Sequence, residues 1–107
     1  MDPNRIGETY IERGLELDGG DTVMVVVGKS YPHPEGDFAC AWQVRGLSDG
    51  RFDRPTGVDA VQSLWLALQM IGAYLYTSAE GRARRLTWLG EADLGFPVTK
   101  GLEDLLP

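Results

Sequence analysis

The chain contains one histidine, His33, and histidine is the side chain type that most readily gains or loses a proton near neutral pH. It lies in a proline- and glycine-rich stretch with Glu35 and Asp37 close behind it. One of these carboxylates could orient the imidazole, or the three side chains could bind a metal ion. Their spacing matches no established metal motif. We therefore interpret His33 as an exposed loop residue and predict no metal site.

A nucleophilic site would need Cys40 or a serine beside a base. Cys40 alternates with Phe38 and Trp42, which turns its side chain toward the same side as these two rings and predicts a buried, unreactive thiol. No G-x-S-x-G sequence occurs, and a catalytic triad would have to use His33. We predict no catalytic residue and no cofactor.

Charged side chains in the segment 47–56 are the remaining candidates. Asp49 and Asp53 could perform acid–base chemistry only in a buried setting, and turn residues are the simpler interpretation. Arg51 and Arg54 precede the N terminus of a predicted helix, an end that attracts anions. They form a weak candidate for anion binding, because Asp59 already lies at that helix end.

The element that must position any such site is the segment 57–77, the longest run without a helix breaker. Its spacing predicts one long helix, capped by Thr56 and Asp59 in a capping box. One side follows the i, i+3, i+4, i+7 pattern of a helix that packs on a core. The residues on this predicted core face are Val61, Leu64, Trp65, Leu68, Ile71 and Leu75.

The other side of the helix is also apolar, with Leu66, Met70 and Tyr74 at successive turns. A helix that is apolar almost all round is normally covered on two sides. The sheet covers one side, and either the C-terminal tail, residues 90–107, or another protein chain covers the second. Leu66, Met70 and Tyr74 are therefore our candidate partner-binding residues.

Alternation of apolar and polar residues predicts strands at 9–17 and 38–44, and a β-branched run predicts a central strand at 22–29. Gly19 and Gly20 mark a hairpin between the first two strands, and 85–89 is a short fourth strand. Arg13 is the one misfit on an apolar strand face; either a bulge at Gly14 turns it outward or it reaches an acid at the sheet edge.

These elements predict an α+β fold, β-β-β-α-β: a three-stranded antiparallel meander, one long central helix packed on the sheet, and a short fourth strand. We favour the strand order 3-2-1-4, with the fourth strand parallel to the first; the alternative places the fourth strand beside the third. The 107 residues form a single domain, with residues 1–7 as a loose N-terminal lead-in.

The net charge of −6 makes nucleic acid a poor candidate partner and a basic protein a better one. The single cysteine excludes an internal disulfide and fits a reducing compartment. The first residues do not form a signal peptide, and the helix is too polar to cross a membrane. We therefore expect a cytoplasmic protein.

Four segments carry a resemblance: RPTGVDA at 54–60, LALQMIG at 66–72, LYTS at 75–78 and LGFP at 94–97. In these segments the chain resembles a family of small uncharacterised bacterial proteins, a domain of unknown function. The resemblance covers the second half of the chain well and the strands loosely. It implies a bacterial origin and a freestanding domain, and it brings no catalytic or binding residues with it.

We therefore expect a non-enzymatic protein-interaction module, for example an immunity-type inhibitor of a basic toxin or a homodimerising accessory protein. The alternative is a small-molecule or anion-binding domain, or a weak hydrolase, that uses the loops 30–37 and 47–56. The alternative requires a pocket that holds His33 or Arg54 beside a carboxylate.

Overall fold

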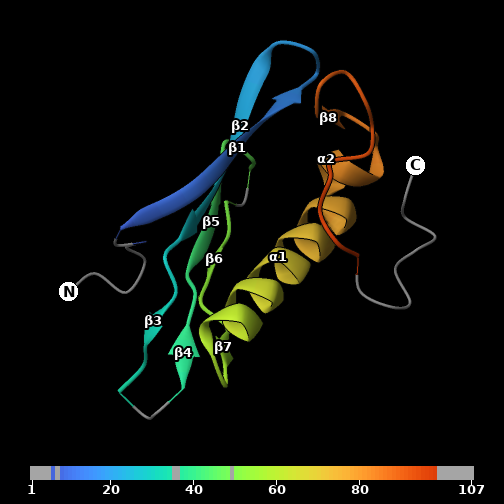
Figure 1. Ribbon diagram of the computed structural model, residues 1–107. Coiled ribbons are helices and arrows are strands. Elements are labelled where there is room, and N and C mark those ends of the chain that lie inside the picture. The colour runs from blue at the N-terminus through green and yellow to red at the C-terminus, as the bar shows by residue number, and fades with distance from the viewer. Residues whose placement is uncertain (1–5, 7, 35–36, 49, 99–107) are drawn as a thin grey trace.

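The computed structural model describes residues 6, 8–34, 37–48 and 50–98, in which one main helix packs against antiparallel sheets (Figure 1). The helices are α1 (Ala60–Thr77) and α2 (Ala79–Arg82). The strands are β1 (Thr9–Leu17), β2 (Asp21–Gly28), β3 (Tyr31–Pro32), β4 (Phe38–Ala39), β5 (Trp42–Arg45), β6 (Phe52–Asp53), β7 (Thr56–Gly57) and β8 (Leu86–Thr87).

The predicted α+β class is confirmed, but the predicted three-stranded meander with one further strand is wrong. The eight strands of the described residues form two antiparallel sheets, one in the order β6-β5-β2-β1-β8 and one in the order β3-β4-β7. The additional strands have only two residues each, which is too short for a pattern of alternation to reveal them.

The hairpin between β1 and β2 forms where the sequence predicts it. Asp18 and Gly19 both have positive φ angles, 55° and 75°, and the N–H of Gly20 donates to the carbonyl of Leu17 at 3.2 Å. Two successive residues with positive φ give the turn the twist of the flanking strands. The turn fixes the register in which Leu15 pairs with Val23 and Arg13 with Val25.

The two sheets are successive parts of one bent meander. In the larger sheet β6, β5 and β2 are neighbours, and in the smaller sheet β7, β4 and β3 are neighbours. In sequence, β2 is followed by β3, β4 by β5 and β6 by β7, so each pair continues from one sheet into the other. At the bend, the N–H of Gly28 donates to Ala41 O at 2.8 Å and the N–H of Cys40 donates to Pro55 O at 3.1 Å. The predicted strand 38–44 is therefore divided at Cys40 and Ala41, because its neighbours bend at the same level.

The predicted order of the four main strands, 3-2-1-4, is confirmed as β5-β2-β1-β8, but the predicted direction of the last strand is wrong. β8 is antiparallel to β1, not parallel to it. The reason is that β6 and β7 carry the chain back along the sheet before the helix starts. As a result α1 begins beside β7 and ends near the β1–β2 turn, so β8 has to run away from that turn (Figure 1).

The helix begins three residues later than a cap at Thr56 would require, so that predicted cap is wrong. Asp59 is the N-cap: its side chain accepts from the N–H of Gln62 at 2.8 Å. The side chain of Gln62 accepts in turn from the N–H of Val58 at 2.7 Å. Thr56 cannot take this role because it is part of β7, where it pairs with Ala39.

The side of α1 that packs on the sheets agrees with the prediction only in part: Ile71 and Leu75 are fully buried, and Leu64 and Leu68 pack against the core. Val61 is 76% exposed and Trp65 is 51% exposed, so the prediction that both face the core is wrong. The residues in their place include small ones; the fully buried side of α1 comprises Ser63, Ala67, Ile71 and Leu75.

Small residues lie there because the backbones come close together. A Cβ atom on Gly57 of β7 would lie 2.7 Å from the backbone N of Ser63, so glycine is required at this contact. A helical-wheel prediction assigns the large apolar side chains to the buried face, and it therefore cannot identify a face on which small residues allow close backbone contact.

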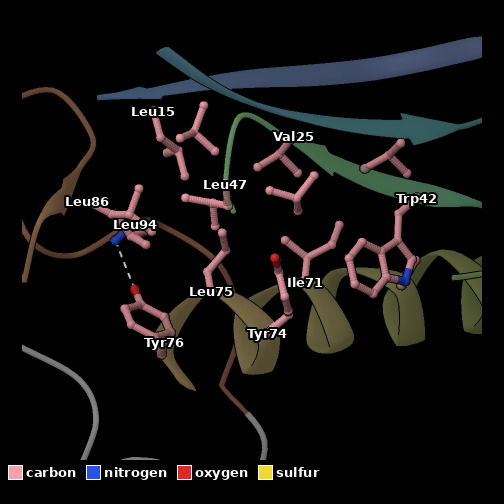
Figure 2. Close-up of a cluster of buried hydrophobic side chains, with 14 of the residues drawn as sticks. Leu15, Val25, Trp42, Leu47, Ile71, Tyr74, Leu75, Tyr76, Leu86 and Leu94 are labelled. Carbon is pink, nitrogen blue, oxygen red and sulfur yellow. Dashed lines mark hydrogen bonds between the residues drawn. The ribbon is translucent and has the colours of Figure 1, made fainter. Parts of the chain in front are cut away.

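Figure 2 shows the core between the larger sheet and the C-terminal half of α1. Ile71 points from the helix toward the sheet, Leu75 points toward Leu47, and Trp42 of β5 reaches toward Tyr74, with ring centroids 6.0 Å apart. The inner face of the sheet is wider than one helix. Leu94, which is also fully buried, fills the part next to β1 that α1 does not cover.

The chain after β8 is held against α1 by two contacts. The hydroxyl of Tyr76 accepts from the backbone N–H of Leu94 at 2.8 Å (Figure 2). Farther along the helix, a Cβ atom on Gly72 would collide with the carbonyl oxygen of Pro97. The segment 94–98 therefore covers one flank of α1, and residues 99–107 of the predicted tail lie outside the described residues.

Candidate functional site

The structure places His33 in the short β3–β4 hairpin, where the residue is half-buried. Its backbone N–H donates to the backbone carbonyl of Asp37. Glu35, which follows His33 in the sequence and was considered with it as a metal ligand, lies outside the described residues. Within the described ranges, no group of three His, Cys, Asp or Glu side chains could hold a metal ion.

Cys40 is fully buried at the bend between the sheets. Its Sγ donates to the carbonyl of Gly28 at 3.4 Å. Burial raises the pKa of this thiol, and a hydrogen bond with Ser30 opposes the rise only in part. Because a nucleophilic cysteine must react as the thiolate, this arrangement favours an unreactive thiol.

The two arginines of the weak anion-binding candidate are both exposed. Arg51 lies 3.4 Å from the carboxylate of Asp53, and the backbone N–H of Arg54 donates to the same carboxylate at 2.7 Å. The adjacent end of α1 is capped by Asp59. A carboxylate thus already faces Arg51 and the helix end, and Asp49 lies outside the described residues.

The three candidate partner-binding residues lie at different depths. Tyr74 is only 8% exposed and belongs to the core, whereas Leu66 and Met70 are half-buried. Met70 packs at the margin of the core, to which Phe96 and Val98 of the C-terminal segment also belong. An incoming protein could contact Leu66 and Met70 directly but could not reach most of Tyr74.

An open apolar surface lies between the first half of β1 and α1. Two neighbouring pockets, with volumes of about 370 and 240 Å³, follow these two elements. They share one groove, because Ile11 and Tyr10 are consecutive on β1 and Leu68 and Leu64 are one turn apart on α1. We call this surface the β1–α1 groove; its apolar lining includes Tyr10, Ile11, Val27, Val61, Leu64, Leu68, Phe96 and Pro97.

A β-bulge brings two neighbouring side chains of β1 to the groove. Thr9 pairs with Gly28 and Ile11 pairs with Val27, so Tyr10 is an extra residue without a partner in β2. A bulge interrupts the alternation of side chains across a strand. Tyr10 and Ile11 consequently both line the groove, and they remain 59% and 43% exposed.

Arg13 forms one wall of the groove and binds the C-terminal segment. Its guanidinium donates to Leu94 O at 3.0 Å and to Gly95 O at 3.3 Å, between the rings of Trp88 and Phe96. Neither predicted explanation for this residue is correct. The bulge lies at Tyr10 and not at Gly14, and the partners of Arg13 are carbonyls and rings, not an acid.

On the helix, Trp65 and Val61 continue the groove onto the surface. They are neighbours at i and i+4 and are among the most exposed large apolar side chains of the described residues, together with Tyr10 and Ile11. The sequence does carry a signal for this surface: no charged residue occurs between Asp59 and Glu80. This surface is not the predicted second apolar side of the helix, which comprised Leu66, Met70 and Tyr74.

Neither of the two pockets is lined by His33 or Arg54. No helix among the described residues is long and apolar enough to span a membrane.

Residues 11–98 match the model of a protein family that is described as "Domain of unknown function (DUF6968)". The match takes in the strands of both sheets and the main helix, and includes most of the residues that line the groove. No curated protein and no solved structure matches the chain.

Proposed function

Because the chain belongs to the DUF6968 family, whose description assigns no activity, we propose from its structure that it is a non-enzymatic protein-interaction module that binds its partner in the β1–α1 groove. The observation that carries this proposal is the clustering of Tyr10, Ile11, Val61 and Trp65. All four side chains are large, apolar and exposed; Tyr10, Ile11 and Val61 line the groove, and Trp65 lies one turn after Val61 on α1. Contiguous apolar patches on a folded chain mark interaction sites.

The composition of the groove also fits a protein partner. Tyr and Trp provide a large contact area with little loss of side-chain entropy, and both are enriched at the centres of protein interfaces. A partner that lies across the groove would cover Val61 of α1, which neither the sheets nor residues 94–98 bury.

The net charge of −6 favours a basic partner. In this proposal the protein acts in a bacterial cytoplasm, and its partner is either another protein, as for an immunity-type inhibitor of a basic toxin, or a second copy in a homodimeric accessory protein. The alternative of a ligand site in the loops 30–37 and 47–56 has less support, because neither of the two pockets described above is lined by His33 or Arg54.

Site-specific photo-crosslinking in cells that produce the protein naturally tests this proposal. A photoreactive phenylalanine derivative replaces Trp65 in one variant and Arg82, an exposed residue of α2, in the control variant. We expect a discrete crosslinked product only at position 65, and we expect Val61→Asp in the same chain to abolish it. The mass of the product distinguishes a second copy from another protein. Equal crosslinking at both positions, or none at position 65, would contradict the proposal.

A further inference from the structure

We propose that the partner binds as an extended strand along the free edge of β1, and that this strand alternates apolar residues with lysine or arginine. This inference rests on the proposed function, because it specifies how the β1–α1 groove is occupied. Its basis is the position of β1 in the larger sheet, the direction of its backbone groups and the charges along one of its faces.

β1 pairs with β2 along its whole length, but on its other side it pairs with β8 only at Glu16 and Leu17. From Thr9 to Leu15, no strand of the described residues lies beside this edge (Figure 1). An open strand edge presents backbone donors and acceptors that another strand can use. Such an edge is normally short, bulged or covered, and here the bulge at Tyr10 lies at one end of it.

The side to which the backbone groups of each β1 residue point can be derived from the hydrogen bond that directly follows β1. The N–H of Asp18 donates to Arg85 O, on the side of β8. Because successive residues of a strand direct their backbone groups to opposite sides, those of Gly14 and Glu12 also point to the β8 side, where β8 has already ended. These two residues therefore offer a partner strand two N–H groups and two carbonyls.

The two faces of β1 differ in chemistry. The inner face carries Ile11 and borders the groove, whose lining here is Leu68, Phe96 and Pro97. The outer face carries Glu12 and Glu16, which are both exposed and have no ion pair within the described part of the chain. Alternate side chains of an added strand would thus lie over the apolar groove and over the outer face. On the outer face, a residue opposite Gly14 would be a diagonal neighbour of both Glu12 and Glu16, although Glu16 itself is opposite Thr87 of β8.

The charges identify the occupant as a basic strand and not a second copy of β1. If two copies of β1 paired antiparallel along this open stretch, their outer faces would meet on the same side of the joined sheet, and Glu12 of one copy would come close to Glu12 of the other. Like charges at neighbouring positions across strands are destabilising. Arg13 does not relieve this, because it lies on the inner face with its guanidinium between Trp88 and Phe96. Lys29, the other base that lines the groove, lies at the far end, after β2.

The test is direct titration of the purified protein with synthetic peptides of about eight residues, an ordinary strand length. The first peptide alternates lysine and valine, the second alternates glutamate and valine, and the third is the lysine peptide methylated on alternate backbone nitrogens. We expect the first peptide to bind. We expect the second and third to bind at least about tenfold more weakly, because they lose charge complementarity or backbone hydrogen bonds.

The double variant Glu12→Lys/Glu16→Lys should bind the lysine peptide about tenfold more weakly, and Glu91→Lys, an exposed control, should bind it as the wild type does. Circular dichroism verifies that each variant is folded. Equal affinity for the methylated peptide, a preference for the glutamate peptide, or no binding of the lysine peptide would overturn the inference. A homodimer in sedimentation that the lysine peptide does not dissociate would overturn it in favour of a second copy.

The two proposals can fail separately. If the lysine peptide does not bind but position 65 still crosslinks to a partner, strand addition is wrong and the groove remains the interaction surface. If crosslinking at position 65 is also absent, both proposals fail.

Discussion

The guanidinium carbon of Arg13 lies 3.8 Å from the centroid of the Trp88 ring, which joins the middle of β1 to the chain just after β8. The same guanidinium donates to the carbonyls of Leu94 and Gly95. One side chain thus fixes the C-terminal segment under β1 and shapes the wall of the β1–α1 groove.

Arg13→Lys should lower the free energy of unfolding by about 1–2 kcal/mol, because an ammonium group cannot both stack between two rings and donate in fixed directions to two carbonyls. Arg82→Lys is the matched control, since Arg82 is exposed and is expected to change stability by less than about 0.5 kcal/mol. Chemical denaturation measures both. Equal stability of the two variants would show that Arg13 does not fasten the C-terminal segment.

Gly57→Ala should lower the free energy of unfolding by about 1–3 kcal/mol, because its new methyl group would lie 2.7 Å from the backbone N of Ser63 and force β7 and α1 apart. Gly20→Ala provides the control. A Cβ atom there meets no atom within 4 Å, and the φ angle is not positive, so we expect no loss of stability. A Gly57→Ala protein as stable as Gly20→Ala would contradict the close approach of β7 to the helix.

Tyr76→Phe should destabilise the protein by about 1–3 kcal/mol at neutral pH, because the buried N–H of Leu94 loses its acceptor. Thermal unfolding at pH 7 of the two proteins measures this loss. It would be contradicted by a variant as stable as the wild type.

The same substitution should change the response to alkaline pH. Burial, with Asp93 acting in the same direction, raises the pKa of Tyr76 above 10.0, although the hydrogen bond from Leu94 opposes the rise. The folded state therefore retains this proton more tightly than the unfolded state, and its contribution to stability is fully present below pH 10 and is lost as the pH rises further. Above pH 10 the stability of the wild type should fall more steeply than that of Tyr76→Phe. Cys40, whose pKa is also raised, is present in both proteins and cancels in the comparison. Parallel pH curves would contradict this prediction.

Trp65→Ser and Val61→Ser should leave the free energy of unfolding within about 0.5 kcal/mol of the wild-type value, because both side chains are exposed in the isolated chain. Ile71→Ala, on the buried side of the same helix, should cost about 2–5 kcal/mol. Urea denaturation compares the three variants. If Trp65→Ser were as destabilising as Ile71→Ala, the helix would be rotated relative to the structure described, and the groove would not exist.

The hairpin and the larger sheet could be predicted from the sequence because their signals are local. Asp18 and Gly19 supply the two positive φ angles of the turn, and the β-branched run of β2 requires cover on both faces. The strand order followed from short connections between neighbouring strands. The direction of β8 could not be predicted, because it depends on β6 and β7, which have two residues each.

The candidate site could be predicted only in part. The absence of charge along α1 indicates that the sheet alone does not cover the helix. This inference holds for any rotation of the helix about its axis. Which side faces outward depends on the contact between Gly57 and Ser63, where small residues replace large ones. The contribution of β1 to the groove depends on the bulge at Tyr10, and no residue pattern in that strand predicts a bulge there.

Residue-resolved amide hydrogen exchange, measured by NMR with and without the lysine–valine peptide, tests the central claim most directly. In the free protein, the amides of Glu12 and Gly14 should exchange much faster than that of Arg13, which faces β2. Bound peptide should slow exchange at Glu12 and Gly14 and perturb the signals of Ile11 and Trp65. Slow exchange at Glu12 and Gly14 in the free monomer, or peptide binding that leaves both amides unprotected, would contradict the claim that the edge of β1 is the site where a partner strand is added.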